Sequence, residues 1–365
     1  MAKIKDITDF LESIAPKAYQ EDYDNAGLIT GDPRAEVKGV LCTLDCIESI
    51  IDEAIQRDCN LIVAHHPIVF RGLKQLNGKN YVERTIIKAI KNDIAIYAIH
   101  TNLDNVEVGV NKKIAEKIGL KNTSILSPKS ATLTKLEVFI PEEDTNQVLD
   151  ALHESGAGNI GNYSNCSFRV VGTGTFKPND KANPTIGKHN EQEEVNENKV
   201  ELIFPTYLKH RILNTLRKAH PYEEVAYYLQ TIENKNQEVG SGMVGELDQP
   251  MESEEFLSHL KKAMQLNTIK YTPLHQGKIS RVAVCGGAGS FLLRAAMGAG
   301  ADAFVTSDFK YHEFFDAEGK IMIADIGHYE SEVFTKELLG AFISEKFANI
   351  ATYLSEVNTN PVKYF

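Results

Sequence analysis

The sequence predicts an α/β protein in which one α/β unit occurs twice, with a smaller α+β domain inserted between the two copies. Strand-length apolar runs alternate with helical patterns near both ends of the chain, and such alternation is typical of a parallel sheet. The pattern changes in the middle of the chain. A length of 365 residues also exceeds what one hydrophobic core usually spans, which favours two domains.

The first copy contains three predicted strands separated by helices. After the first strand, Ile50, Ile51 and Ala54 recur at helical spacing and form one apolar face. A later helix stops at Gly119, the position that glycine commonly takes at helix ends. The predicted strands cover residues 37–44, 60–64 and 94–99, and the predicted helices cover residues 4–19, 47–57, 81–92 and 110–118.

The second predicted strand runs directly into two adjacent histidines, His65 and His66, and then Pro67. Neighbouring residues of a strand point to opposite faces, so both histidines can serve one site only if the strand ends before them. Pro67 supports that end because it cannot donate to a sheet ladder. Two interpretations stay open: a pair of metal ligands, since imidazole often binds metals, or one surface histidine beside one satisfied by a hydrogen bond.

Two acidic residues, Asp22 and Asp24, lie in a polar stretch before the first strand. Their carboxylates could face a cation. Acidic loop residues are mostly exposed, however, so the sequence favours a solvated loop.

The inserted domain is predicted to cover residues 128–250, between domain halves at 1–127 and 251–365. Such an insertion costs little free energy, because the entropic cost of closing a loop grows slowly with the length of the loop. The polar run 188–199 is expected to bulge into solvent, and His220-Pro-Tyr-Glu-Glu224 fits a capped turn better than a ligand contact. The predicted strands cover 135–140, 168–176, 200–204 and 225–229, with helices at 144–155 and 207–219.

The last part of the chain repeats the first pattern. Strands are predicted at 281–285, 301–305 and 320–325, helices at 291–298 and 333–347, and a short strand at the C-terminus. Cys42 and His66 are separated by the same number of positions as Val284 and Asp308. Matched spacing of this kind indicates an internal repeat. Two such units facing each other would bring the polar residues at their strand ends into one cleft.

Titratable residues at these strand ends predict a metal centre. His328 and Glu332 are four positions apart, so on a helix they share a face. Histidine combined with carboxylate suits zinc, iron or manganese. These histidines and carboxylates are too many ligands for one closed tetrahedral site, but they fit two metals bridged by a carboxylate. Glu332 is the predicted bridge. The four clusters are His65/His66, His100/Asp104, Asp308/Lys310/His312 and His328/Glu332.

Other residues near the predicted cleft have less specific patterns. His100 could lie behind the metals as a supporting group, and Lys310 and His312 could contact substrate. The run Gly286-Gly-Ala-Gly-Ser290 is predicted to open a helix directly after a strand, so its amides, at Gly287 and Gly289 among others, could cradle an anion. A tight turn that needs small residues explains the same run equally well.

Composition narrows the class of protein. The net charge of −11 disfavours nonspecific binding to nucleic acid. We expect no membrane-spanning segment, because no window approaches the apolar length that a membrane helix needs. The N-terminal residues lack the apolar core of a signal peptide, and five scattered cysteines suit a reducing cytoplasm.

Several motifs, taken in order, resemble those of the Nif-three-like (YbgI-like) family, whose members often carry the name GTP cyclohydrolase 1 type 2 homologue. The resemblance implies a duplicated α/β fold, a dinuclear metal centre, and a toroidal homohexamer whose metal sites face an internal cavity. The motifs are His65-His66-Pro67, Ile99-His-Thr-Asn-Leu-Asp104, Gly286-Gly-Ala-Gly-Ser290, Ser307-Asp-Phe-Lys-Tyr-His312 and Gly327-His-Tyr-Glu-Ser-Glu332. Carried over position by position, the family's metal ligands fall on His65, His66, Asp104, His328 and Glu332.

The resemblance extends to the insertion. Gly172-Thr-Gly-Thr-Phe176 and His220-Pro-Tyr-Glu-Glu224 make it similar to the middle domain of the longer bacterial members, which resembles small ferredoxin-like signalling and divalent-ion-tolerance proteins.

Two functional classes stay open. The first is a hydrolase that uses two divalent ions per chain on a nucleotide or related phosphorylated small molecule, with Lys310, His312 or the glycine run holding the anion. The alternative is a non-enzymatic metal-binding or regulatory protein whose insertion senses a ligand or partner.

Overall fold

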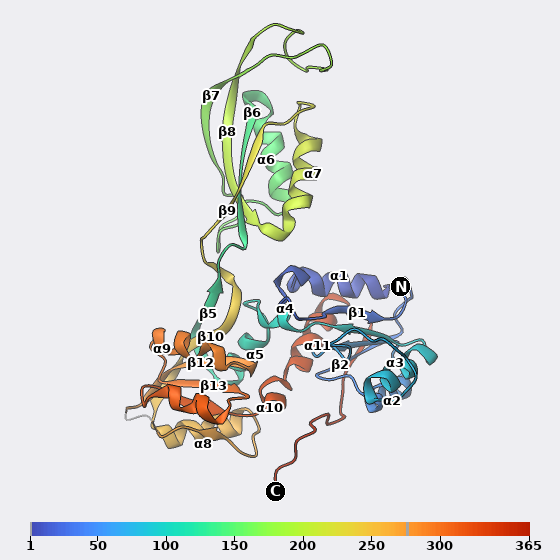
Figure 1. The fold of residues 1–365 in the computed structure, drawn as a ribbon, viewed down its shortest axis with the longest axis vertical. Coiled ribbons are helices and arrows are strands. Elements are labelled where there is room, and N and C mark those ends of the chain that lie inside the picture. The colour runs from blue at the N-terminus through green and yellow to red at the C-terminus, as the bar shows by residue number, and fades with distance from the viewer. Residues whose placement is uncertain (1, 275–276) are drawn as a thin grey trace. The chain divides into compact units, whose positions relative to one another are not determined.

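The computed structural model describes residues 2–274 and 277–365 and divides the chain into two compact units (Figure 1). Unit 1 contains residues 1–128 and 238–365, and unit 2 contains residues 129–237. Residues 238–250, which the sequence assigns to the insertion, belong to unit 1, because their strand β10 (Asn236–Met251) pairs with β12 (Ile279–Ala288). Within the described residues no helix is long and apolar enough to cross a membrane.

The first sheet of unit 1 has the strand order β1-β4-β3-β2-β15. All neighbours are parallel except β1, which is antiparallel to β4. Alternate strand residues enter two hydrophobic clusters, so the sheet is buried on both faces and its strands are apolar runs. The strands are β1 (Gly27–Thr30), β2 (Gly39–Thr43), β3 (Leu61–Ala64), β4 (Ala95–Ala98) and β15 (Ala351–Leu354). The helices are α1 (Ile4–Ile14), α2 (Glu48–Gln56), α3 (Tyr81–Lys91), α4 (Thr101–Asp104), α5 (Val110–Ile118) and α11 (Thr335–Lys346).

The second sheet of unit 1 has the strand order β11-β14-β13-β12-β10-β5. Its central strands β12, β13 and β14 are parallel, and β11 is antiparallel to β14. The remaining strands are β5 (Leu120–Lys129), β11 (Lys270–Tyr271), β13 (Ala303–Ser307) and β14 (Met322–Asp325), and the helices are α8 (Ser253–Ala263), α9 (Leu293–Gly298) and α10 (His328–Glu332).

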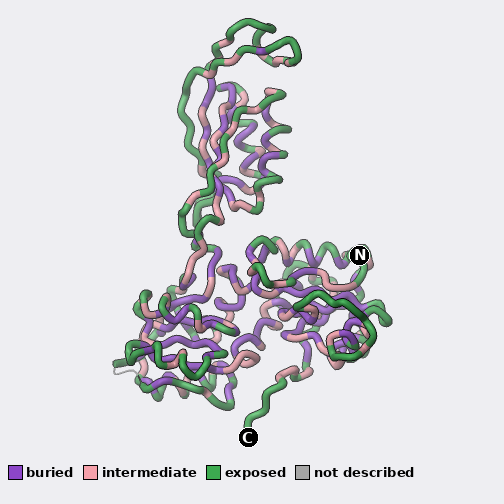
Figure 2. The backbone as a smooth tube through the Cα atoms, viewed as in Figure 1, coloured by how far each residue is buried: buried purple, intermediate pink, exposed green. Residues whose placement is uncertain are grey.

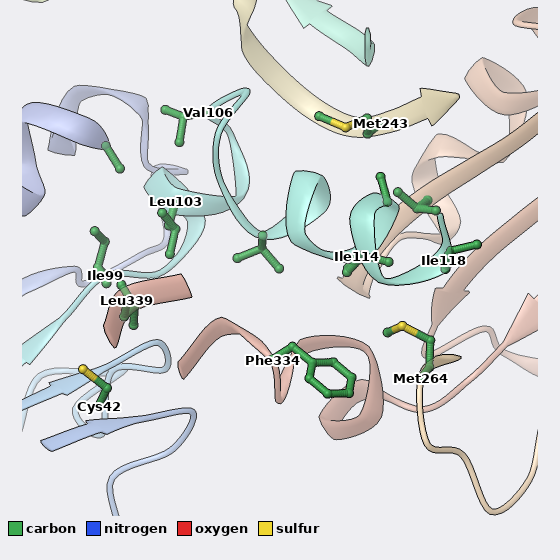
Figure 3. Close-up of a cluster of buried hydrophobic side chains, with 14 of the residues drawn as sticks. Cys42, Ile99, Leu103, Val106, Ile114, Ile118, Met243, Met264, Phe334 and Leu339 are labelled. Carbon is green, nitrogen blue, oxygen red and sulfur yellow. The ribbon is translucent and has the colours of Figure 1, made fainter. Parts of the chain in front are cut away.

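One hydrophobic cluster joins the two sheets. Val63 of β3 and Val305 of β13 both belong to it, together with Ile114 of α5 and Leu339 of α11. Figure 3 shows part of this cluster, with Ile114 and Met243 near one sheet and Cys42 and Ile99 near the other. Because the sheets share this core, the ends of their strands keep a defined mutual position.

The two sheets have matching registers. Val40 pairs with Leu61, and Val282 pairs with Ala303, so the paired residues have the same separation along the chain in both sheets. Each parallel trio also has an antiparallel strand beside its third member. The prediction of a mixed α/β fold is therefore confirmed, and the repeat inferred from spacing has a counterpart in the strand pairing.

Unit 2 contains an antiparallel sheet in the order β7-β8-β6-β9, with α6 and α7 on one face (Figure 1). Val138, Val200 and Phe204 are fully buried and share one hydrophobic cluster with residues of both helices. Figure 2 shows that buried and exposed segments alternate along unit 2. The elements are β6 (Leu133–Pro141), α6 (Thr145–Glu154), β7 (Phe168–Phe176), β8 (Glu193–Pro205), α7 (Lys209–Ala219) and β9 (Tyr227–Ile232).

Two local predictions were wrong for physical reasons. The first helix ends at Ile14 because Pro16 follows, and a short 3-10 helix, Lys17–Tyr19, replaces its predicted last turn. Residues 193–199 belong to β8 and pair with β7, so only the first part of the polar run 188–199 is a loop. Tertiary pairing there overrides the low strand propensity of Glu and Asn.

Replacing Phe304 by Ala is expected to lower the free energy of unfolding by about 3–5 kcal/mol, because the ring is fully buried and its loss leaves a cavity. Urea unfolding followed by circular dichroism measures this. Phe315, which is 65% exposed, is the matched control, and Phe315→Ala should change the value by less than about 0.5 kcal/mol. Equal effects of the two substitutions would contradict the assignment of Phe304 to the core.

Candidate metal centre

The candidate site of unit 1 lies at four strand ends. His65 and His66 follow β3, and His100 follows β4. Asp308 follows β13, and α10 begins shortly after β14. The carboxyl ends of parallel strands are where open α/β sheets usually place their ligand sites.

The strand β3 ends at Ala64, before the two histidines, as Pro67 predicts. The amide of His65 donates to Thr43 at 3.2 Å, and that of His66 donates to Leu44 at 2.9 Å. The two imidazole centroids lie 5.0 Å apart. Both rings can therefore face the same centre.

Each of the four imidazoles has its Nδ1 atom next to an oxygen acceptor. The pairs are His65 with the Ile99 carbonyl at 2.8 Å, His66 with Asp45 at 2.7 Å, His100 with Asp24 at 2.8 Å, and His328 with Asp308 at 2.6 Å. An acceptor at Nδ1 holds a proton there and fixes the ring orientation. The other nitrogen, Nε2, is then available to bind a metal. Metal-binding histidines usually have such an acceptor at their second ring nitrogen.

The two carboxylate oxygens of Glu332 face different groups of residues. Oε2 lies 3.0 Å from Nε2 of His66 and 3.1 Å from Nε2 of His328, whereas Oε1 lies 3.8 Å from Nε2 of His65. Asp104 lies 3.5 Å from the same His65 nitrogen. Ligand atoms within 4.8 Å of one another form three groups: His65/Asp104/Glu332, His66/His328/Glu332 and His65/His66/His100.

Two buried atoms of the cluster have no hydrogen-bond partner among the described residues: Nε2 of His65 and Oδ1 of Asp104. Buried polar atoms nearly always have a partner, and leaving them without one costs about 1–3 kcal/mol each. A cation between these two atoms would satisfy both. The donor set of nitrogen and carboxylate oxygen thus fits a transition-metal ion.

Without a metal, protons compensate the charge of the cluster. Burial lowers the pKa of His66, but hydrogen bonds to Asp45 and Glu332 outweigh it and raise that pKa to about 10. Burial likewise lowers the pKa of His328, and its contacts with Glu332 and Asp308 raise it to about 9. Burial and the negative charge of Glu332 raise the pKa of Asp104 to about 8.

Glu332 stays ionised in this environment. Burial raises its pKa, but the neighbouring imidazoles of His328, His65 and His66 more than compensate and hold the pKa well below the usual value. The carboxylate is therefore the permanent negative charge around which the imidazoles gather.

Sequence reasoning missed two supporting carboxylates. Asp24 was predicted to lie in a solvated loop, but its carboxylate is buried and also accepts from the amide and the hydroxyl of Thr101. Burial raises its pKa, and the bonds from His100 and Thr101 outweigh burial and lower it to about 2. Asp45 lies two residues after β2, and that position just beyond the end of a central strand was the available signal.

Glycine geometry allows the close packing around Glu332. A Cβ atom on Gly287 would lie 2.7 Å from Glu332 Oε1 and 3.3 Å from a ring carbon of His328. Gly287 also has a φ of 60°, which disfavours other residues. Asp308 holds a φ of 59° without being glycine, a conformation often seen near functional sites.

The structure brings together the five residues expected as ligands but not all of the expected substrate residues. Lys310 and His312 are exposed and line neither of the two pockets described next. The amide of Gly287 donates to Ser331 at 3.0 Å, so it is not open to an anion. Gly289 lies against Thr306 and Cys285, and residues 286–288 continue β12 rather than opening a helix.

Two pockets adjoin the cluster within unit 1. One, of about 590 Å³, is lined by His66, His328 and Lys270, and the other, of about 1110 Å³, by His66 and Arg71. Both volumes fall in or near the range of sites for small molecules. Residues 360 and 361 line both pockets, and the Thr359 hydroxyl donates to Asp45 at 2.6 Å. The C-terminal segment thus contacts the group that orients His66.

Fold and site together define an α/β protein with a candidate metal centre between the strand ends of two sheets. A family model for Duf34/NIF3 (NGG1p interacting factor 3) matches residues 2–361. The chain therefore belongs to the Duf34/NIF3 family.

Relatives and solved structures agree with this assignment. The chain is 39% identical over 364 residues to the "GTP cyclohydrolase 1 type 2 homolog" of Bacillus subtilis, covering 98% of this chain and 97% of that one. The protein of the same name from Halalkalibacterium halodurans is 40% identical, with 98% of each chain covered. A Bacillus cereus protein related to NIF3 superposes with a TM-score of 0.87 at 36% identity, covering 100% and 99% of the two chains. Staphylococcus aureus protein SA1388 gives 0.80 at 32%, with the same coverage.

Zinc binding is expected to release about two to three protons per chain near neutral pH, because the raised pKa values leave His66, His328 and Asp104 protonated there. Apparent affinity should then rise at least about tenfold per pH unit between about pH 6 and 8. Calorimetry in buffers of different ionisation enthalpy measures both quantities. His312→Ala should leave them unchanged, and an affinity independent of pH would contradict the assigned protonation.

Proposed function

We propose that the chain binds two divalent metal ions, of zinc, iron or manganese, with Glu332 between them. His65 and Asp104 would hold one ion, and His66 and His328 the other. The observation that supports this most directly is the division of the Glu332 oxygens between the two residue groups. Nε2 of His65 and Oδ1 of Asp104, which have no hydrogen-bond partner among the described residues, support a first ion between them. The Nδ1 contacts of His66 and His328 orient these two rings for a second ion.

We infer that this centre serves a hydrolase acting on a nucleotide or related phosphorylated small molecule. Two bound metals lower the pKa of water and neutralise negative charge on a phosphoryl group. The chain itself would contribute shape and charge: Asp45 and Asp308 orient imidazoles, and Lys270 places an ammonium group in the pocket beside them. Nucleotides are the first substrates to test, since the two relatives above carry the name GTP cyclohydrolase 1 type 2 homolog.

A second candidate function is metal-dependent regulation without turnover. This function is favoured by burial in the group His65/Asp104/Glu332, because His65 is fully buried and Glu332 is 3% exposed. Structural metal sites are closed in this way, whereas catalytic sites keep an open position. The exposed side of His328, which lines a pocket, favours the hydrolase for the second group.

We also propose the finer organisation that the family resemblance implies: a toroidal homohexamer in the cytoplasm, with a duplicated α/β unit and a ferredoxin-like insertion. The order β6-α6-β7-β8-α7-β9 and the sheet order β7-β8-β6-β9 support the last point. Buried free thiols at Cys42, Cys46, Cys59 and Cys285 suit a reducing compartment. Light scattering after gel filtration should give about six times the chain mass of 40.6 kDa for a hexamer.

Elemental mass spectrometry on the purified chain, reconstituted with zinc or manganese, is expected to find about two metal ions per chain. Glu332→Ala should reduce this to less than about one, because both groups lose a ligand. Asp104→Asn and His328→Ala should each leave about one ion. Glu330→Gln, on the same helix α10, is the control and should retain both ions. A full complement of metal in Glu332→Ala would exclude the shared carboxylate.

The metal-loaded chain is expected to hydrolyse at least one nucleotide in a panel, either at a phosphate group or at the base. Glu332→Ala should reduce this turnover at least about a hundredfold. Lys270→Ala should raise KM more than it lowers kcat, because its ammonium, which pairs with Asp325 in the pocket lining, would face the anion rather than the metals. Liquid chromatography of the products measures this. A metallated chain that leaves the whole panel intact would favour the regulatory function.

A further inference from the structure

A pocket of about 370 Å³ lies among residues of unit 2, whereas the residues of the proposed metal centre belong to unit 1. It is bounded by parts of β6, β7 and β8, by the loop from 177 to 186, and by the turn that begins at His220. Its apolar surface comes from Phe139, Phe176, Pro178, Pro184, Ile186 and Ala226. Its size is in the range of pockets for small organic molecules.

Hydrogen bonds fix the walls of this pocket. The Asn183 amide donates to Glu223 at 2.6 Å, and the Thr185 hydroxyl donates to the Pro221 carbonyl at 2.8 Å. Both bonds join the loop to the turn. The wall is therefore preformed.

His220 holds the turn and is not a ligand group itself. Its Nε2 contacts the Phe139 carbonyl at 2.9 Å, and its Nδ1 accepts from the Tyr222 amide at 3.1 Å. Burial lowers its pKa, so the ring is neutral near pH 7 and both nitrogens are occupied. The capped turn that the sequence favours for residues 220–224 agrees with these contacts.

The pocket contains a buried carboxylate that has no cationic partner among the residues that the structure describes. Glu197 is only 7% exposed, and no Lys, Arg or His of the described residues forms an ion pair with it. Lys177 also lines the pocket but is exposed. A Cβ atom on Gly174 would lie 2.1 Å from Glu197 Oε2, so only glycine leaves room for the carboxylate there. Buried carboxylates are rare unless they are paired, so this one calls for a positive partner.

Aromatic rings and a buried hydroxyl accompany the carboxylate. The Phe176 and Tyr222 ring centroids lie 6.0 Å apart. The Tyr222 hydroxyl lies near Glu197 and has no partner in hydrogen-bonding geometry among the described residues. Glu223 and Glu224 add two further carboxylates to the lining. Aromatic faces beside carboxylates are the usual surroundings of a bound organic cation.

We propose that this pocket binds a small organic cation, a primary amine attached to an aromatic or apolar body. The ammonium group would pair with Glu197 and reach the Tyr222 hydroxyl, and the body would pack against Phe139, Phe176 and Tyr222. The proposal does not depend on the metal centre.

Titration calorimetry of the full chain with tyramine tests the proposal, with 3-(4-hydroxyphenyl)propionate as the probe of matched size and opposite charge. Tyramine should bind with a dissociation constant below about 1 mM, and the acid at least about tenfold more weakly. Glu197→Gln, which preserves size, should weaken tyramine binding at least about tenfold. Glu194→Gln, at an exposed position of the same strand, should leave it unchanged.

A second variant guards against misfolding. Gly174→Ala displaces the Glu197 carboxylate without changing any charge, so it should also weaken tyramine binding while circular dichroism stays native. Equal binding of amine and acid, undiminished binding in Glu197→Gln, or no binding of tyramine at several millimolar would each overturn the proposal.

Discussion

The charge of one buried carboxylate organises unit 1. Glu332 is 3% exposed, and an ionised group in such a place costs several kcal/mol unless opposite charge and hydrogen bonds surround it. His65, His66 and His328 approach it, and each imidazole has a further acceptor behind it. Protons or metal ions can supply the positive charge. This balance explains why histidines and acids gather where two sheets meet.

The shared hydrophobic cluster makes this arrangement possible. β3 and β4 belong to one sheet and β13 and β14 to the other, yet alternate residues of both enter the same core. The strand ends are therefore held in place by packing that involves no site residue. Backbone constraints then refine the positions: Gly287 leaves room for Glu332, and Asp308 adopts a positive φ where it contacts His328. In unit 2, Gly174 leaves room for the Glu197 carboxylate in a similar way.

Much of this could be predicted from the chain alone. Apolar runs located the central strands to within a few residues, because strands buried on both faces must be apolar. Motif order and position indicated the five candidate ligands. The strands β5 and β10 were missed because their patterns are irregular and they pair over long distances. The glycine run was misread as a helix opening because small residues permit several conformations, and β12 continues through it.

The sequence by itself determined the central strands and most of the helices, their matched spacing in the two sheets, and the residue types at each strand end, since these follow from local periodicity and spacing. Only the tertiary structure decided which oxygen of Glu332 faces which histidine, and that Asp24 and Asp45 support His100 and His66. It also decided that no basic residue in the described part of the chain pairs with Glu197. Those facts depend on contacts between segments far apart in the chain. Such contacts arise from packing and charge balance, which leave no local pattern in the sequence.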